Sequence, residues 1–223
     1  MSIFAKAQNS WIVGAIQKTF KITIINPENE PRGTAAESFI VCANHSSNWD
    51  PVIIGACMHR PLRYMAKSEL FKIPILNSII KWFGAYPVNR GKADISSIKT
   101  TLNILEQGES VGMYIQGGRK RGIHPRDTIP KNGVAMMAVK AKCGVLPVSM
   151  ISKKHKLGMF RKTIFVFGEY IPYDELVKDC GVTSDSENGS KISENMTLYK
   201  EVTNKIYSEI ITNYDKHDIL NKK

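Results

Sequence analysis

Residues 39–51 read FIVCANHSSNWDP, and this stretch decides how the chain folds. The apolar run over residues 39–43 predicts a buried strand that ends near Ala43. Asp50 followed by Pro51 is typical of a helix start, with the aspartate as N-cap and the proline at the first helical position. The stretch therefore predicts a strand, a turn and a helix in direct succession.

The turn holds His45, and Asp50 follows five positions later. On a single helix this spacing would place the two side chains on different faces, but a turn can bring the imidazole back over the carboxylate. A neutral imidazole accepts a proton near pH 7, and a carboxylate on its other ring nitrogen fixes the tautomer and stabilises the imidazolium. The pair is a candidate general base. From this segment alone, the alternative is a hydrogen-bonded turn histidine beside an ordinary helix cap.

Beyond this segment, short apolar runs alternate with longer helical patterns. We expect strands over residues 37–43, 62–66, 85–88, 111–115, 145–150 and 163–167. We expect helices over residues 51–58, 73–83, 94–107, 130–142 and 193–213, a polar connector after residue 20 and a mobile loop over 178–191. This alternation predicts the α/β class, with a largely parallel central sheet flanked by helices.

The length favours a single domain over residues 1–223. Residues 1–20 predict an N-terminal amphipathic helix with Trp11, Ile16 and Phe20 near one face. That face could pack on the core or lie in a membrane interface, and the sequence favours neither. The apolar stretch from Trp11 to Ile16 is too short to span a bilayer and no signal peptide is recognisable, so we expect no membrane crossing and no secretion.

The formal net charge of +11 is concentrated in the middle of the chain, where residues 60–162 contain 20 Lys and Arg against 5 Asp and Glu. A basic field suits nucleic acid, an acidic membrane surface or a phosphorylated substrate, unless it is only a solvated face. Nucleic acid is disfavoured because the aromatic residues do not interleave with the basic ones as a stacking platform requires. The four cysteines are scattered, so we expect thiols rather than disulfides or zinc ligands.

Three basic residues stand at predicted strand ends or turns, where open α/β sheets bind ligands: Lys67, Arg90 and Arg119. Gly117 and Gly118 directly precede Arg119, and paired glycines let a backbone approach an anion closely. Arginine offers a planar fork for phosphate oxygens. Together these residues predict a phosphate site near the His45–Asp50 turn, although any one of them alone would be an ordinary surface charge.

Four blocks over residues 38–150 resemble the 1-acyl-glycerol-3-phosphate acyltransferases of glycerolipid synthesis, in that family's order. The blocks are NHSSNWDP (44–51), MAKSEL (65–70) running into FGAYPVNRG (83–91), YIQGGR (114–119) and VLPV (145–148). The resemblance implies that His45 takes the proton from a glycerol hydroxyl while Asp50 orients it. The oxygen would attack an acyl thioester directly, without an acyl-enzyme intermediate.

The resemblance also implies the partners. The acceptor would be lysophosphatidic acid, a lysophospholipid, and the product phosphatidic acid in phospholipid synthesis. The donor would be acyl-CoA or an acyl-carrier protein, both acidic, with no metal or resident cofactor. The enzyme would be a peripheral protein on the cytoplasmic side of the membrane.

Within the third block, the resemblance assigns the site to Gln116, Gly117, Gly118 and Arg119, with Lys67 and Arg90 as further phosphate contacts. Glycine N–H groups there would face the developing oxyanion. The family usually reads F-P-E-G-T-R here, so this chain departs from it at Ile115, Gln116 and Gly118. This departure leaves open another lysolipid or glycerol 3-phosphate as acceptor, or a catalytically weak lipid-binding protein.

Overall fold

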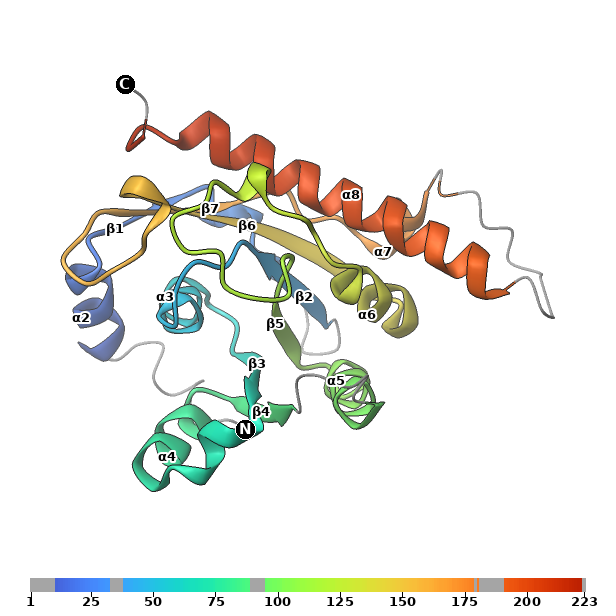
Figure 1. The fold of residues 1–223 in the computed structure, drawn as a ribbon, viewed down its shortest axis with the longest axis horizontal. Coiled ribbons are helices and arrows are strands. Elements are labelled where there is room, and N and C mark those ends of the chain that lie inside the picture. The colour runs from blue at the N-terminus through green and yellow to red at the C-terminus, as the bar shows by residue number, and fades with distance from the viewer. Residues whose placement is uncertain (1–10, 33–37, 89–94, 179, 181–190, 222–223) are drawn as a thin grey trace.

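The centre of the molecule is a seven-stranded sheet (Figure 1). The computed structural model describes residues 11–32, 38–88, 95–178, 180 and 191–221. The strands are β1 (Ile22–Ile25), β2 (Phe39–Ala43), β3 (Leu62–Lys67), β4 (Ala85–Val88), β5 (Ser110–Tyr114), β6 (Gly144–Ser152) and β7 (Thr163–Phe167), in the spatial order β1-β7-β6-β2-β5-β3-β4. The strands from β6 to β4 run parallel, whereas β7 is antiparallel to β6 and parallel to β1. The predicted α/β fold with a largely parallel sheet is confirmed.

Helices cover both faces of this sheet. They are α2 (Trp11–Thr19), α3 (Asp50–Cys57), α4 (Pro74–Trp82), α5 (Ile95–Glu106), α6 (Gly133–Ala141), α7 (Tyr173–Val177) and α8 (Lys191–His217). Short 3₁₀ helices are η1 (Pro27–Asn29), η2 (Ser68–Lys72), η3 (Pro125–Asp127) and η4 (Lys153–His155). One apolar core lies between the sheet and α5, α6 and α8, and a second lies on the side of α2 and α3.

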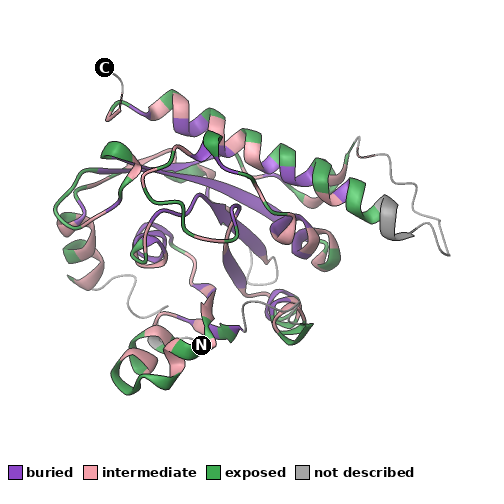
Figure 2. Cartoon of the chain, viewed as in Figure 1, coloured by how far each residue is buried: buried purple, intermediate pink, exposed green. Residues whose placement is uncertain are grey.

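Strand β2 contributes to both cores. Ile40 and Cys42 of β2 lie in the core of α5, α6 and α8, and Val41 and Ala43 lie in the core of α3. Figure 2 shows the central strands buried along their length. Burial on both faces explains why this strand is an uninterrupted apolar run rather than an alternating one.

Two elements differ from the prediction. The expected polar connector after residue 20 is wrong for residues 22–25, which form the edge strand β1. This strand pairs with β7, far along the chain, so no local pattern announces it. The five-residue helix α7 was also missed, because it is too short for a helical period to show. The predicted cap Asp94, and residues 179 and 181–190 of the predicted mobile loop, lie outside the described residues.

The described part of the predicted N-terminal helix is α2, which packs on α3. Gln17 Nε2 donates to the Ala56 carbonyl at 2.8 Å, and the Phe20 and Trp49 ring centroids are 5.6 Å apart. Trp11 at the other end is 83% exposed. Across the described ranges, no helix has both the length and the apolar character needed to cross a bilayer.

The parallel arrangement gathers several chain exits at one edge of the sheet. The turn with His45 follows β2, Lys67 ends β3, and the glycine turn 117–118 follows β5. Asn44 extends the pairing beyond β2: its Nδ2 donates to the Met150 carbonyl at 3.0 Å, and its Oδ1 accepts from the Met150 amide at 2.8 Å. Since β2, β5 and β3 are neighbours, these exits lie together, as in other open α/β sheets.

Gly112 in β5 gives a test of the packing at this sheet. It pairs with Tyr64 of β3, and a Cβ at Gly112 would overlap the tyrosine ring. Gly112→Ala should therefore lower the free energy of unfolding by about 1–3 kcal/mol in urea denaturation. Gly14→Ala in α2, where a Cβ meets nothing within 4 Å, is the control and should be neutral or stabilising. Equal effects of the two changes would contradict this packing.

Candidate active site

His45 and Asp50 lie in contact at the carboxyl edge of the sheet. His45 Nδ1 is 2.7 Å from Asp50 Oδ2, and both side chains are buried. A carboxylate accepts only, so Nδ1 carries the proton and Nε2 keeps a lone pair. The predicted turn geometry is confirmed. The arrangement can hold an imidazole in the tautomer that a general base needs.

Asp50 is held by the turn before it. The same Oδ2 accepts from the amides of Ser46 (2.6 Å) and Ser47 (2.9 Å). Asp50 is the first residue of α3 and Trp49 occupies the N-cap position, so the prediction of Asp50 as cap is off by one residue. The carboxylate bonds the preceding turn and the imidazole, and the positive end of the helix dipole favours its charge.

The imidazole is stacked on Tyr114, the last residue of β5. The two ring centroids are 3.8 Å apart with an interplanar angle of 12°. Burial, and then the negative charge of Asp50, raise the pKa of the Tyr114 hydroxyl well above its usual range, so it stays protonated. Hydrogen bonding by Asp50 and stacking by Tyr114 together leave the imidazole little freedom to rotate.

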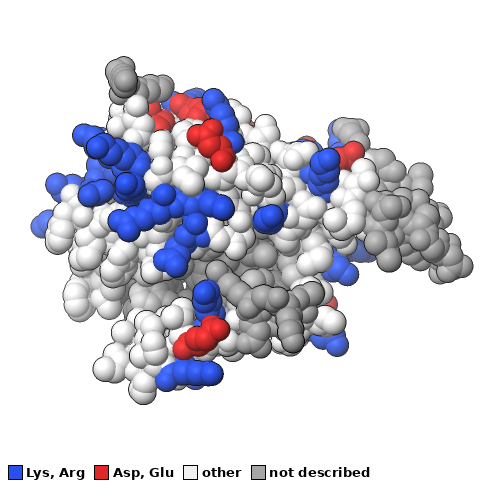
Figure 3. Space-filling view, in the orientation of Figure 1, with Lys and Arg blue, Asp and Glu red and all other residues white. Residues whose placement is uncertain are grey.

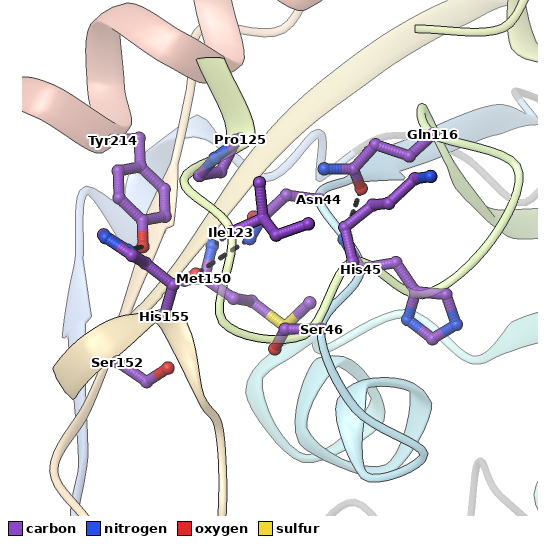
Figure 4. Close-up of a pocket in the computed structure, with 11 residues that line it drawn as sticks. Asn44, His45, Ser46, Gln116, Ile123, Pro125, Met150, Ser152, His155 and Tyr214 are labelled. Atoms are coloured by element: carbon purple, nitrogen blue, oxygen red, sulfur yellow. Dashed lines mark hydrogen bonds between the residues drawn. The ribbon is translucent and has the colours of Figure 1, made fainter. Parts of the chain in front are cut away.

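The backbone of His45 is fixed from the β5–α6 loop. Its amide donates to Gln116 Oε1 at 2.7 Å, and its carbonyl accepts from the Lys120 amide at 2.7 Å. Figure 4 shows Gln116 reaching the His45 backbone. Tyr214 and His155 line the other side of the same pocket, and the imidazole points away from them. The turn after β5 therefore positions the residue that the turn after β2 carries.

Gln116 was predicted to bind substrate, but both ends of its buried amide bond the protein. Its Nε2 donates to Thr128 Oγ1 at 3.2 Å, and the Thr128 hydroxyl donates to the Pro125 carbonyl. Since that hydroxyl is already donating, Thr128 offers Gln116 an acceptor. This direction of bonding suits an amide and opposes a carboxylate at position 116.

The predicted phosphate contacts are only partly described. Lys67 at the end of β3 and Arg119 after β5 are exposed, whereas Arg90 lies outside the described residues. Figure 3 shows Lys and Arg side chains gathered over the 119–121 turn and the β6–β7 loop, above a hollow in this face. The exposed cations therefore lie at the same edge of the sheet as His45.

The glycine turn follows β5 at residues 117–118. Gly117 has a φ of +64°, which explains a glycine there, but its amide donates to the Tyr114 carbonyl at 3.1 Å. The Gly117 amide is therefore engaged within the turn. Among the described residues, no acceptor contacts the amide of Gly118. That amide is the remaining glycine donor of the turn.

Sequence reasoning missed four contributions: the stacking of Tyr114, the amides of Ser46 and Ser47, the amide of Lys120 and the hydroxyl of Thr128. Tyr114 opens the third block, so its proximity to His45 could have been anticipated from parallel strands. The other contacts use backbone amides or a loop threonine, which leave no mark in the sequence.

A family model described as Acyltransferase matches residues 21–151, which include all of this geometry. The chain belongs to this acyltransferase family. A 1-acyl-sn-glycerol-3-phosphate acyltransferase of Bacillus subtilis is 30% identical over 142 residues, 63% of this chain and 68% of that protein. One of Streptococcus pneumoniae is 35% identical over 115 residues, 51% of this chain and 41% of that protein.

A solved structure shares the fold of this acyltransferase. The crystal structure of the 1-acyl-sn-glycerophosphate (LPA) acyltransferase PlsC from Thermotoga maritima superposes with a TM-score of 0.67. The match covers 100% of this chain and 86% of that one, at 21% identity. At this identity the likeness supports the fold alone.

The Gln116 contact gives a test of the site's architecture. Gln116→Glu should lower the free energy of unfolding by roughly 1–2 kcal/mol at neutral pH, because a carboxylate cannot donate to Thr128. Burial, with only the His45 amide as donor and none for the second oxygen, raises the folded-state pKa of such a carboxyl, so the loss should shrink as the pH falls and the group protonates.

Urea unfolding at several pH values measures this effect. Gln107→Glu is the matched control, because Gln107 is exposed at the end of α5 and its side-chain amide donates to Asn103 Oδ1 at 3.4 Å. A loss in the Gln116 variant that is no larger than in the control would contradict the directional bonding.

Proposed function

We propose that this acyltransferase moves an acyl chain from an acyl thioester to the free hydroxyl of lysophosphatidic acid, giving phosphatidic acid. The observation that carries the proposal is the 2.7 Å contact between His45 Nδ1 and Asp50, which leaves Nε2 as a proton acceptor. The two bacterial relatives are named for this reaction, which supports the choice of acceptor.

In the proposed reaction, His45 Nε2 takes the proton of the acceptor hydroxyl as its oxygen attacks the thioester carbonyl. Asp50 stabilises the imidazolium that results, and Tyr114 keeps the ring in place. The tetrahedral intermediate then collapses, the carbon–sulfur bond breaks, and the imidazolium returns its proton to the leaving thiolate. The base starts the next cycle unchanged, so atoms and protons balance.

The transfer is direct in this proposal. The backbone amides of Ser46 and Ser47 are used to hold Asp50, and the Ser47 hydroxyl accepts from the Trp49 amide at 3.3 Å. We assign these serines to the support of the carboxylate and give them no role as nucleophiles. The amide of Gly118 is the donor that we assign to the developing oxyanion.

The acceptor's phosphate would lie against Arg119 and Lys67, and the resemblance adds Arg90 as a third cation. Guanidinium groups bind phosphate oxygens through paired N–H donors, and the side chains of Arg119 and Lys67 are exposed. The donor would be acyl-CoA or an acyl-carrier protein, as a co-substrate and without a resident cofactor. Both polar ends of Gln116 are engaged within the protein, so its presence gives no reason to prefer another acceptor.

His45→Ala tests the base. Turnover should fall about 10³-fold, the scale of a lost general base. The fold should survive, because the bonds of His45 to Gln116 and Lys120 use its backbone. The measurement is acceptor-dependent thiol release from a long-chain acyl thioester.

The matched control for that test is His59→Ala. His59 also pairs with a buried carboxylate, Glu30, at 2.9 Å, but it lies before β3 at the opposite edge of the sheet. Its replacement should leave turnover near the parent value. A His45 variant that keeps the parent rate would exclude the proposed mechanism.

Arg119→Ala tests the phosphate contact. The KM for lysophosphatidic acid should rise about tenfold, as expected for losing one charge-assisted contact, while the KM for the thioester changes little. Arg32→Ala is the control, because Arg32 lies at the opposite edge of the sheet from His45. It is two residues after Glu30, whose carboxylate accepts from the amides of His59 and Arg60 just before β3. Equal turnover of phosphorylated and dephosphorylated acceptors by the parent protein would refute a phosphate site.

We also propose that the protein works as a peripheral enzyme at the cytoplasmic surface of a membrane. Its acceptor and product are lipids, and the basic field suits an anionic leaflet.

A further inference from the structure

The loop between β6 and β7 presents large apolar side chains to solvent at its tip. In this β6–β7 tip, defined as residues 156–162, Met159 is 46% exposed and Phe160 is 70% exposed. Phe160 also has a φ of +60°, a left-handed conformation that is disfavoured for a bulky residue. A conformation that strains the backbone and leaves an aromatic ring in water gains nothing from the protein's own core.

This conformation is held by backbone hydrogen bonds to other elements. The Phe160 amide donates to the Thr19 carbonyl at the end of α2, at 2.8 Å. At the root of the loop, the Thr163 amide donates to the Lys21 carbonyl at 3.3 Å. The backbone of the β6–β7 tip is therefore held in place by hydrogen bonds to the end of α2 and the residues after it.

Basic side chains lie within the tip and beside it. Seven exposed cations come from the loop, from the last turn of α2 and from the segment after it: Lys18, Lys21, Lys153, Lys154, Lys156, Arg161 and Lys162. The sequence has no Asp or Glu over residues 11–25 or 151–168. Figure 3 shows this side of the molecule as a group of Lys and Arg side chains beside uncharged surface.

An exposed aromatic and a methionine beside a group of cations match the chemistry of an anionic bilayer surface. Apolar side chains gain by entering the boundary between headgroups and acyl chains, and Lys and Arg gain from anionic headgroups. A wholly polar partner such as nucleic acid would leave Met159 and Phe160 without a favourable environment. The combination of the two features therefore favours lipid over a purely electrostatic partner.

We propose that the β6–β7 tip is a membrane-docking element that inserts Met159 and Phe160 into an anionic bilayer, with the surrounding cations on its headgroups. The proposal deepens the proposed function and rests on it for its purpose, which is to bring a lipid substrate to the site. The Gly122 amide donates to the His155 carbonyl at 2.9 Å, and the Lys120 amide donates to His45. Docking at the tip would thus place the turn that positions His45 near the surface.

Vesicle co-sedimentation of the full chain tests this proposal. The vesicles contain phosphatidylcholine alone or phosphatidylcholine mixed with phosphatidylglycerol. The parent should bind the mixed vesicles, and replacing both Met159→Ser and Phe160→Ser should weaken that binding roughly tenfold. Replacing both Arg161→Glu and Lys162→Glu should weaken it to a similar extent and lessen the parent's preference for anionic lipid.

The matched control is Met196→Ser on α8. Met196 is 53% exposed and belongs to the far end of α8, which Figure 1 shows at the opposite end of the molecule from the β6–β7 loop. The control should bind vesicles as the parent does. Thermal unfolding of each variant shows that weaker binding is not caused by loss of fold.

Three outcomes would overturn the proposal. The first is parent-like vesicle binding by the Met159/Phe160 double variant. The second is equal loss in the Met196 control. The third is self-association of the parent in the absence of lipid that the double variant abolishes, which would make the tip an interface between two copies.

Turnover separates this proposal from the proposed function. With a short-chain acceptor dissolved as monomers, the Met159/Phe160 double variant should react at the parent rate. A parent that binds anionic vesicles through the tip but consumes no thioester would support docking and refute the proposed function alone.

Discussion

The buried carboxylate of Asp50 is the group on which the rest of the site depends. One of its oxygens accepts from His45 Nδ1 and from the amides of Ser46 and Ser47. A buried charge is tolerated only where such donors are supplied, so the turn after β2, the start of α3 and the orientation of the imidazole form one unit. Any change that displaces one member leaves the charge under-bonded. The free-energy cost of burying a carboxylate without its donors favours the conformation in which the turn supplies them.

The second constraint is the order of the parallel strands. His45 follows β2, while Tyr114 and Gln116 belong to the end of β5, about 70 residues further along the chain. Parallel pairing puts both exits at one edge, where Tyr114 stacks on the imidazole and Gln116 and Lys120 bond the backbone of His45. The parts of the site are loops that begin at neighbouring strands of a sheet that is buried on both faces.

The turn after β5 links His45 to the β6–β7 tip on the surface. Its Lys120 amide reaches His45, and its Gly122 amide reaches η4, from which the chain continues into the β6–β7 tip and its contact with Thr19. Each link is a backbone hydrogen bond, so it does not depend on the identity of the exposed side chain. The side chains are therefore left to set charge and polarity, and on this face they are mostly cationic.

The sequence by itself determined the strand–turn–helix around His45, the largely parallel sheet, the family, and the two members of the candidate base. These features follow from local signals: an apolar run buried on both faces, an Asp-Pro helix start, and motif blocks in a fixed order. Only the tertiary structure decided that β1 pairs with β7, that Tyr114 stacks on His45, that Gln116 bonds His45 and Thr128, and that the Gly117 amide is already used. The physical reason is that most of these contacts join residues far apart in the chain, and several use backbone groups. Every residue except proline carries the same amide donor and carbonyl acceptor, so the folded geometry, and not the residue type, selects which of them meet.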